Sequence, residues 1–138
     1  MVTLENLLEI EAIRELKGDY WWYVDNKDWK ALREIVTDDY QWYFEGKLLY
    51  KSGDEFLEMV KGTLEGVITA HQGHQYKVEI TGPTSAKGRW MLNDTLRSKE
   101  MEIRDHGFGY YLEEYEKNKD GRWRIKSSDL RYFIKENE

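Results

Sequence analysis

The order of the secondary-structure patterns constrains this chain most, because helical spacing fills its first part and strand-like alternation fills most of the rest. Apolar residues recur at helical intervals from Leu4 to Tyr23, which predicts a helix over 4–25. A shorter helix is expected over 29–36, and a third over 52–66. Since helices come early and strands late, we expect an α+β fold with segregated layers.

The strand-like part opens with a short aromatic hairpin and continues as long antiparallel strands. Pro83 and the turn residues Asp120 and Gly121 separate neighbouring strands. A curved sheet wrapped around the first helices would enclose a cavity open at one end. The expected strands cover residues 40–44, 47–51, 67–70, 76–81, 86–97, 107–117 and 123–133.

Length and composition limit the class of protein. We expect a single domain over the 138 residues, 1–138. The absence of cysteine excludes disulfides and a cysteine nucleophile. A net charge of −6 without a basic patch argues against a nucleic-acid partner, and no apolar run is long enough to span a membrane. Without a secretory signal at the N-terminus, the expected location is cytoplasmic.

The aromatic content is high. Six Trp, ten Tyr and four Phe make up 14% of the chain. Such a content indicates either a large core or an interior cavity that is lined by rings with polar tips.

An aspartate interrupts the apolar face of the strand expected over 86–97. Strand side chains alternate between two faces, so Asp94 shares its face with Trp90 and Leu92. Burying an unpaired carboxylate is costly, so Asp94 needs a partner. We expect His71 to be that partner. Alternatively, the strand frays near Asp94, and solvent or an arginine satisfies the carboxylate.

His71 follows an apolar strand entry, so its side chain is expected to point toward the interior or its mouth. An Asp–His pair holds the imidazole in one tautomer, and such a histidine can take a proton and return it. The alternative is a core or turn histidine that the backbone satisfies. The chain has only three histidines and no clear carboxylate triad beside them, so we expect no metal site.

Three further residues could contribute polar groups to the interior. Tyr20 lies on the apolar stripe of the first helix, and its hydroxyl could donate to a carbonyl, or it is an ordinary core tyrosine. Asp25 ends the same helix, where it either orients another polar group or caps the next helix. Tyr43 carries the hydroxyl of the aromatic strand. The sequence does not decide which face of the strand it lies on, because Trp42 and Phe44 compete for the interior.

Together these segments resemble the SnoaL-like branch of the NTF2-like superfamily, whose fold is a cone-shaped α+β barrel. The resemblance implies three N-terminal helices against a strongly curved, mostly antiparallel sheet. This fold supports dehydratases, isomerases, cyclases, hydrolases and plain binding proteins, so it does not settle function. The segments that carry the resemblance are 10–20, 25–29, 71–74, 86–90, 107–115 and 120–125.

Within the branch, the pattern is closest to the bile acid 7α-dehydratase family and more distantly similar to the scytalone dehydratase family. The resemblance implies that His71 is the catalytic base, that Asp94 orients it, and that Tyr20 and Asp25 complete the site. A further tyrosine of the family falls near Tyr43, or one residue later on Phe44. The expected pocket residues are Trp21, Val24, Trp42, Phe44, Trp90, Leu92 and Tyr111.

These expectations lead to a cofactor-independent dehydratase that acts on a polycyclic or aromatic hydroxy-ketone, a hydrophobic small molecule. The alternatives are a ketosteroid-type isomerase or cyclase that uses the same pocket, or a non-catalytic NTF2-like binding module. A homo-oligomer, either trimer or dimer, is expected because the outer sheet face carries more Tyr and Phe than a small cone should bury, and because relatives associate through that face.

Overall fold

The computed structural model describes residues 2–137 of the chain. Three helices and a short hairpin are followed by four long strands, in the order that the sequence patterns predict. The elements are α1 (Leu7–Asn26), α2 (Trp29–Glu34), β1 (Val36–Phe44), β2 (Lys47–Tyr50), α3 (Gly53–Leu64), β3 (Ile68–Gly82), β4 (Ser85–Ser98), β5 (Ile103–Lys117) and β6 (Trp123–Asn137).

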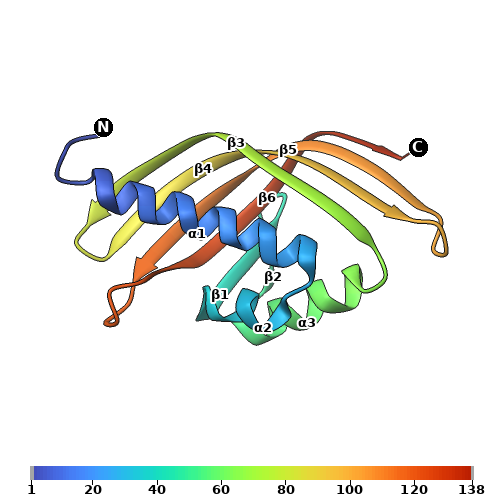
Figure 1. Ribbon diagram of the computed structural model, residues 1–138, viewed down its shortest axis with the longest axis horizontal. Helices are drawn as coiled ribbons and strands as arrows, with labels where there is room; N and C mark the ends of the chain where they lie inside the picture. Colours follow the sequence, from blue (N-terminus) through green and yellow to red (C-terminus); the bar gives the residue numbers. More distant parts are fainter. Residues whose placement is uncertain (1, 138) are drawn as a thin grey trace.

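The strands form one mixed sheet in the order β2-β1-β6-β5-β4-β3. β1 runs parallel to β6, and all other neighbouring pairs are antiparallel. The sheet curves over α1, which crosses its concave side, while α2 and α3 lie below (Figure 1). The α+β fold with a strongly curved sheet is therefore confirmed, although the sheet stays open rather than closing into a barrel.

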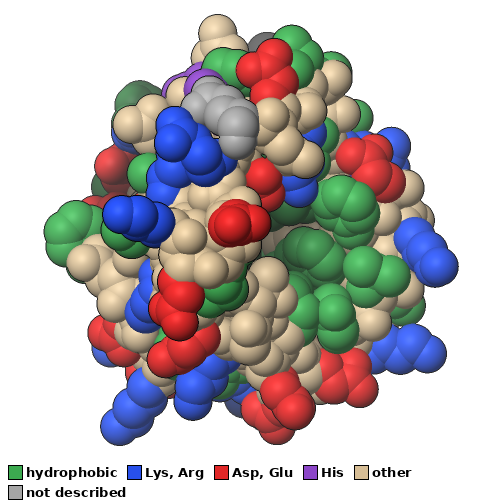
Figure 2. Space-filling view, turned by 90° about the vertical axis from the view of Figure 1, so that its right-hand side faces the viewer, with side chains coloured by type: hydrophobic (Ala, Val, Ile, Leu, Met, Phe, Trp, Pro, Cys, Tyr) green, Lys and Arg blue, Asp and Glu red, His purple; other side chains and the backbone are tan. Residues whose placement is uncertain are grey.

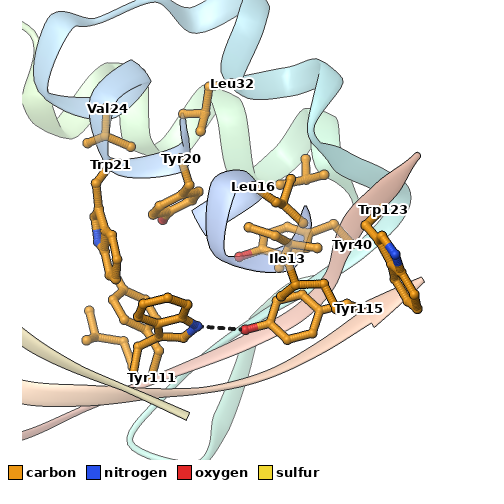
Figure 3. Packing of buried hydrophobic residues seen from close by; sticks show 14 of the residues in the cluster. Ile13, Leu16, Tyr20, Trp21, Val24, Leu32, Tyr40, Tyr111, Tyr115 and Trp123 are labelled. Atoms are coloured by element: carbon orange, nitrogen blue, oxygen red, sulfur yellow. Dashed lines mark hydrogen bonds between the residues drawn. The ribbon is translucent and has the colours of Figure 1, made fainter. Parts of the chain in front are cut away.

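Helix α1 supplies the central wall of the interior. Its buried side chains recur at helical spacing, and Tyr20, Trp21 and Val24 point from the helix toward the sheet (Figure 3). The first turn departs from the expected apolar stripe, because Leu8 is 81% exposed. The buried members of the helix are Ile10, Ile13, Leu16, Lys17, Tyr20, Trp21 and Val24.

The end of α1 is tied to the start of β3. Lys27 ends the helix in the left-handed conformation, and its Nζ donates to the carbonyl oxygen of Val67 over 2.5 Å. Asp28 caps α2, because its side chain accepts from the backbone N–H of Ala31. Asp25 is therefore not needed as the cap of α2.

Four strands differ from the expected ones. β5 begins at Ile103 instead of residue 107, and β6 continues to Asn137 instead of ending at residue 133. β1 begins at Val36 instead of residue 40, because the exposed Asp38 is held by Arg33 within the strand and does not end it. β3 is continuous across residues 71–74, where the sequence suggested a turn between two strands. The irregularity comes later, at Gln75, whose φ of 50° marks a bulge in the pairing with β4.

A lysine and a glutamate form an ion pair inside the molecule. Lys17 Nζ lies 2.9 Å from Glu113 Oε2, and both side chains are fully buried. Ser128 and Tyr115 also donate to Glu113. The ammonium group of Lys17 lies over three aromatic rings, at 3.9 Å from the ring centre of Tyr111. This cluster fills the space beneath α1 with satisfied polar groups.

Within residues 2–137, no helix combines the length and the apolar character needed to cross a bilayer.

Candidate active site

A histidine and an aspartate meet at the end of α1. The Nδ1 atom of His71 on β3 lies 2.6 Å from Oδ1 of Asp25 on α1. The His71 side chain is 11% exposed and that of Asp25 is 23% exposed, so the pair is largely enclosed but still reaches solvent. The hydrogen bond from Lys27 to the Val67 carbonyl oxygen holds α1 and β3 together next to this Asp25–His71 pair.

Further donors hold Asp25 in place. The backbone N–H of His71 donates to Oδ2 over 2.9 Å, and the hydroxyl of Thr69 donates to Oδ1 over 2.8 Å. Burial on its own would raise the pKa of Asp25, but the hydrogen bonds from His71 and Thr69 outweigh it and lower that pKa. Asp25 is therefore an ionised acceptor at neutral pH.

The pairing fixes the tautomer of His71. Because the Asp25 carboxylate only accepts, Nδ1 of a neutral His71 must carry the proton, and Nε2 is left with a lone pair. An imidazole of this form, steadied by a carboxylate, can act as a general base.

Asp94 lies directly opposite His71 in the pairing of β3 with β4. Side chains at such positions have Cβ atoms about 4.5–5.5 Å apart. Its carboxylate, however, accepts from the hydroxyl of Tyr132, with Oη 2.5 Å from Oδ2. The expected hydrogen bond between His71 and Asp94 is therefore wrong, because Asp25 reaches the ring nitrogen from α1.

Tyr132 is a site residue that the sequence analysis missed. It lies on β6, and Gly107 makes room for it, since a Cβ at residue 107 would lie 2.5 Å from the Tyr132 ring and 2.7 Å from Asp94 Oδ1. Burial first, and then the hydrogen bond to Asp94, raise the pKa of Tyr132. The glycine opposite a buried aspartate was the available signal, but the sequence does not show which strand fills the gap.

Tyr20 lies in the interior, with its ring in edge contact with those of Trp21 and Tyr111. Burial, followed by the negative charge of Glu113, raises the pKa of the Tyr20 phenol well above its usual range. The negative charge of Asp25 acts in the same direction. Tyr20 therefore stays protonated and remains a hydrogen-bond donor.

Tyr43 does not share this interior. Its hydroxyl contacts Gln41, and its side chain lines a groove of about 550 Å³ together with Arg89 and Leu112, on the sheet face away from α1. Trp42 and Phe44 point the other way and stack on each other at 6.2 Å. The assignment of Tyr43 to the site is therefore corrected in favour of its two neighbours.

The expected pocket residues all pack in or against the core. Gly73 gives the tip of the Trp21 ring its space, because a Cβ at residue 73 would lie 1.9 Å from that ring. The indole nitrogen of Trp90 donates to the hydroxyl of Tyr115. The buried members are Trp21, Val24, Trp90, Leu92 and Tyr111, and Trp42 and Phe44 are partly buried.

Hydrophobic side chains gather beside a hollow at the end of the molecule toward which the β4–β5 turn extends (Figures 1 and 2). Among the partly buried rings, Tyr132 contacts Phe44 with 6.2 Å between ring centres. Tyr132 also donates its hydroxyl to Asp94, so apolar and polar contacts meet at this ring, a combination that is usual in small-molecule sites.

The free energy of unfolding at acidic pH tests the hydrogen bonds that Asp25 makes. At neutral pH, Asp25→Asn should lower the free energy of unfolding by roughly 1–3 kcal/mol, because hydrogen bonds to a charged group are lost. A carboxyl with a lowered folded-state pKa contributes stability above its unfolded pKa of about 4, and this contribution disappears as the pH falls through the folded-state value. The difference in the free energy of unfolding between wild type and variant should therefore shrink as the pH falls.

Urea unfolding at a series of pH values measures this gap. Asp19→Asn is the matched control, since Asp19 is an exposed aspartate earlier on α1. A gap that stays constant down to about pH 2 would contradict the assigned role of the Asp25 carboxylate.

Comparison with known proteins places the fold. Residues 5–129 match the sequence profile of the SnoaL-like domain. A Novosphingobium aromaticivorans protein classed as a scytalone dehydratase superposes with a TM-score of 0.87, at 20% identity, over 96% of this chain and 89% of that one.

Two other solved structures have the same fold. The LinA-type3 hexachlorocyclohexane dehydrochlorinase of Novosphingobium barchaimii gives a TM-score of 0.84 at 23% identity, over 98% of this chain and 93% of that one. A Mycobacterium tuberculosis protein of unknown function gives 0.80 at 24% identity, over 93% and 73%. At such identities the likeness establishes the fold, and the chemistry must be argued from the site.

Proposed function

Because the chain belongs to the SnoaL-like domain family, we propose that it is a cofactor-independent lyase that removes water from a polycyclic or aromatic hydroxy-ketone. The observation that carries the proposal is the hydrogen bond between His71 Nδ1 and Asp25, which leaves Nε2 as a base at the interior. A dehydratase and a dehydrochlorinase among the structural neighbours support it, since both names denote eliminations.

The reaction begins with proton removal. His71 Nε2 takes a proton from the carbon next to the ketone while the Tyr20 hydroxyl donates to the carbonyl oxygen, which gains negative charge. Asp25 then faces an imidazolium, so the charge formed on His71 is balanced within the hydrogen-bonded pair.

Water leaves in the second step. The bond between the neighbouring carbon and its hydroxyl oxygen breaks, the electrons of the enolate form the new double bond, and the proton held by His71 goes to the departing oxygen. The histidine returns to its starting form, and the products are an unsaturated ketone and water. The acceleration comes from positioning and from preorganised donors.

The same parts could support an isomerase, in which His71 returns the proton to a different carbon and no water is lost. A binding module would need the apolar interior but not the Asp25–His71 contact. The contact between Asp25 and His71 therefore favours the dehydratase and the isomerase over the binding module.

A bicyclic aromatic β-hydroxy-ketone, 3-hydroxy-1-tetralone, provides a direct test. Loss of water converts it into 1-naphthol, which is followed by fluorescence, and a panel of steroid and polyketide hydroxy-ketones can be screened in parallel by mass spectrometry. The proposal predicts catalysed water loss. Binding without conversion across the whole panel would support the binding module, and double-bond migration without water loss would support the isomerase.

We also propose that the chain forms a homo-oligomer, a dimer or a trimer, through the outer face of the sheet. Phe133 on this face is 65% exposed, and Phe108, Leu112 and Ile134 are exposed nearby. The face also carries basic side chains on β4 (Lys87 and Arg89) and acidic side chains on β5 and β6 (Glu114 and Asp129). A second copy related by an axis along the strands would place opposite charges face to face.

Light scattering at micromolar concentration should therefore give a dimeric or trimeric mass for the wild type. The double change Phe108→Glu/Phe133→Glu should give a monomer, because it places charges within the apolar surface. Leu8→Glu is the control, since Leu8 is an exposed apolar residue on α1. A monomeric wild type would contradict the proposal.

A further inference from the structure

Tyr132 and Asp94 form a second hydrogen-bonded pair beside His71. Asp94 is 4% exposed, and its position on β4 is directly opposite His71 on β3. Tyr132 comes from β6, two strands away from β4, and its hydroxyl donates to Asp94 Oδ2 over 2.5 Å. The pair is therefore assembled across three strands, next to the Asp25–His71 pair but separate from it.

The sheet is shaped to allow this contact. Gly107 lies between the two residues in the strand order, opposite Asp94, and any side chain there would meet both the Tyr132 ring and the Asp94 carboxylate. Phe44 and Lys135 flank the Tyr132 ring on its other sides. Tyr132 is thereby held with its hydroxyl directed to the carboxylate.

The Asp94–Tyr132 pair can accept further hydrogen bonds but has no proton left to donate. Tyr132 has one proton, and it is committed to Asp94, so its oxygen retains a lone pair. Among residues 2–137, none donates to Asp94 Oδ1. Burial and the Asp94 contact raise the pKa of Tyr132, so the phenol keeps its proton. A ligand group that complements the pair must therefore be a donor.

We propose that Asp94 and Tyr132 form a hydroxyl-binding subsite, which accepts a hydrogen bond from the hydroxyl group of a bicyclic aromatic β-hydroxy-ketone. The identification of this hydroxyl as the one that is eliminated rests on the proposed function. The subsite makes Tyr132 a specificity-determining residue, because it selects ligands that carry an O–H group on the carbon next to the one from which His71 removes a proton. A ligand with an anionic group at this point would instead face the Asp94 carboxylate.

Binding of two ketones that differ only in the hydroxyl tests the subsite. The probes are 3-hydroxy-1-tetralone and 1-tetralone, and their dissociation constants are measured by tryptophan fluorescence in the His71→Ala variant, where elimination cannot interfere. The hydroxylated ketone should bind about 10- to 100-fold more tightly, as expected for a hydrogen bond to a charged group.

Variants then locate the preference. In the Asp94→Ala/Tyr132→Phe background, the ratio of the two constants should fall to within about threefold of one, because both acceptors are gone. Tyr132→Phe alone should retain a preference, because Asp94 can still accept. Tyr110→Phe should leave the ratio unchanged, since Tyr110 packs against Phe133 on the outer face. Circular dichroism and thermal unfolding check that each variant is folded.

The outcomes separate this inference from the proposed function. A ratio near one with both acceptors present, a preference that survives the double change, or a failure of both ketones to bind would overturn the subsite. A preserved preference in binding, with no conversion to 1-naphthol by the wild type, would support the subsite and refute the elimination. Conversion to 1-naphthol by the wild type, together with equal affinities for the two ketones, would support the elimination and refute the subsite.

Discussion

Replacing His71 with alanine should lower the turnover of 3-hydroxy-1-tetralone by roughly 10²–10⁴-fold, the usual contribution of a general base. The loss is expected in kcat, because the imidazole acts on the proton in the transition state and contributes little to holding the ketone. The fold should survive, since His71 is outside the buried hydrophobic cluster and its side chain reaches solvent.

His74→Ala provides a control on the same strand. His74 is exposed and lies beyond Gly73, away from the contact with Asp25. It should retain the wild-type rate within about twofold, because surface substitutions usually change little. If His71→Ala keeps the wild-type rate on a substrate that the protein demonstrably converts, the mechanism is wrong and another group must remove the proton.

Local patterns predicted the elements well, because helices and strands are set by periodicities within short segments. The three helices lie where these patterns place them, but β3 is one strand where two were expected, and β5 and β6 are longer than expected. The error at 37–39 has a local cause. Asp38 and Asp39 favour turns, but Arg33 binds Asp38 and so supports a strand that begins at Val36.

The partners of the site residues were harder to predict, because they depend on contacts between distant segments. The sequence placed Asp94 and His71 on inward faces, and they do lie opposite each other. Alternation cannot show, however, that Asp25 reaches His71 first or that Tyr132 comes to Asp94 from β6. The choice between Tyr43 and its neighbours also depended on which face of β1 turns toward α3 and the Tyr132 ring, a tertiary property.

The buried Lys17–Glu113 pair was not anticipated, since both residues are ordinary members of charged segments. Its expected energetic signature is large. Glu113→Gln preserves shape but leaves the enclosed Lys17 ammonium without its anion, so the free energy of unfolding should fall by about 3–5 kcal/mol at neutral pH. Urea unfolding measures the loss, and Glu114→Gln, at an exposed neighbour, is the control.

The double variant Lys17→Met/Glu113→Gln should recover most of this loss, because the cost comes from the unpaired charge and an apolar chain of similar length fits among the same rings. The pH dependence of the single variant gives a second test. Burial already lowers the pKa of Lys17, and without Glu113 it should fall further, so the unfolded chain binds the extra proton. Stability of Glu113→Gln should therefore rise between about pH 7 and pH 10, the unfolded pKa of lysine. If the stability of Glu113→Gln does not change with pH, or if the double variant is as unstable as the single one, the loss of stability has a cause other than the unpaired Lys17 ammonium.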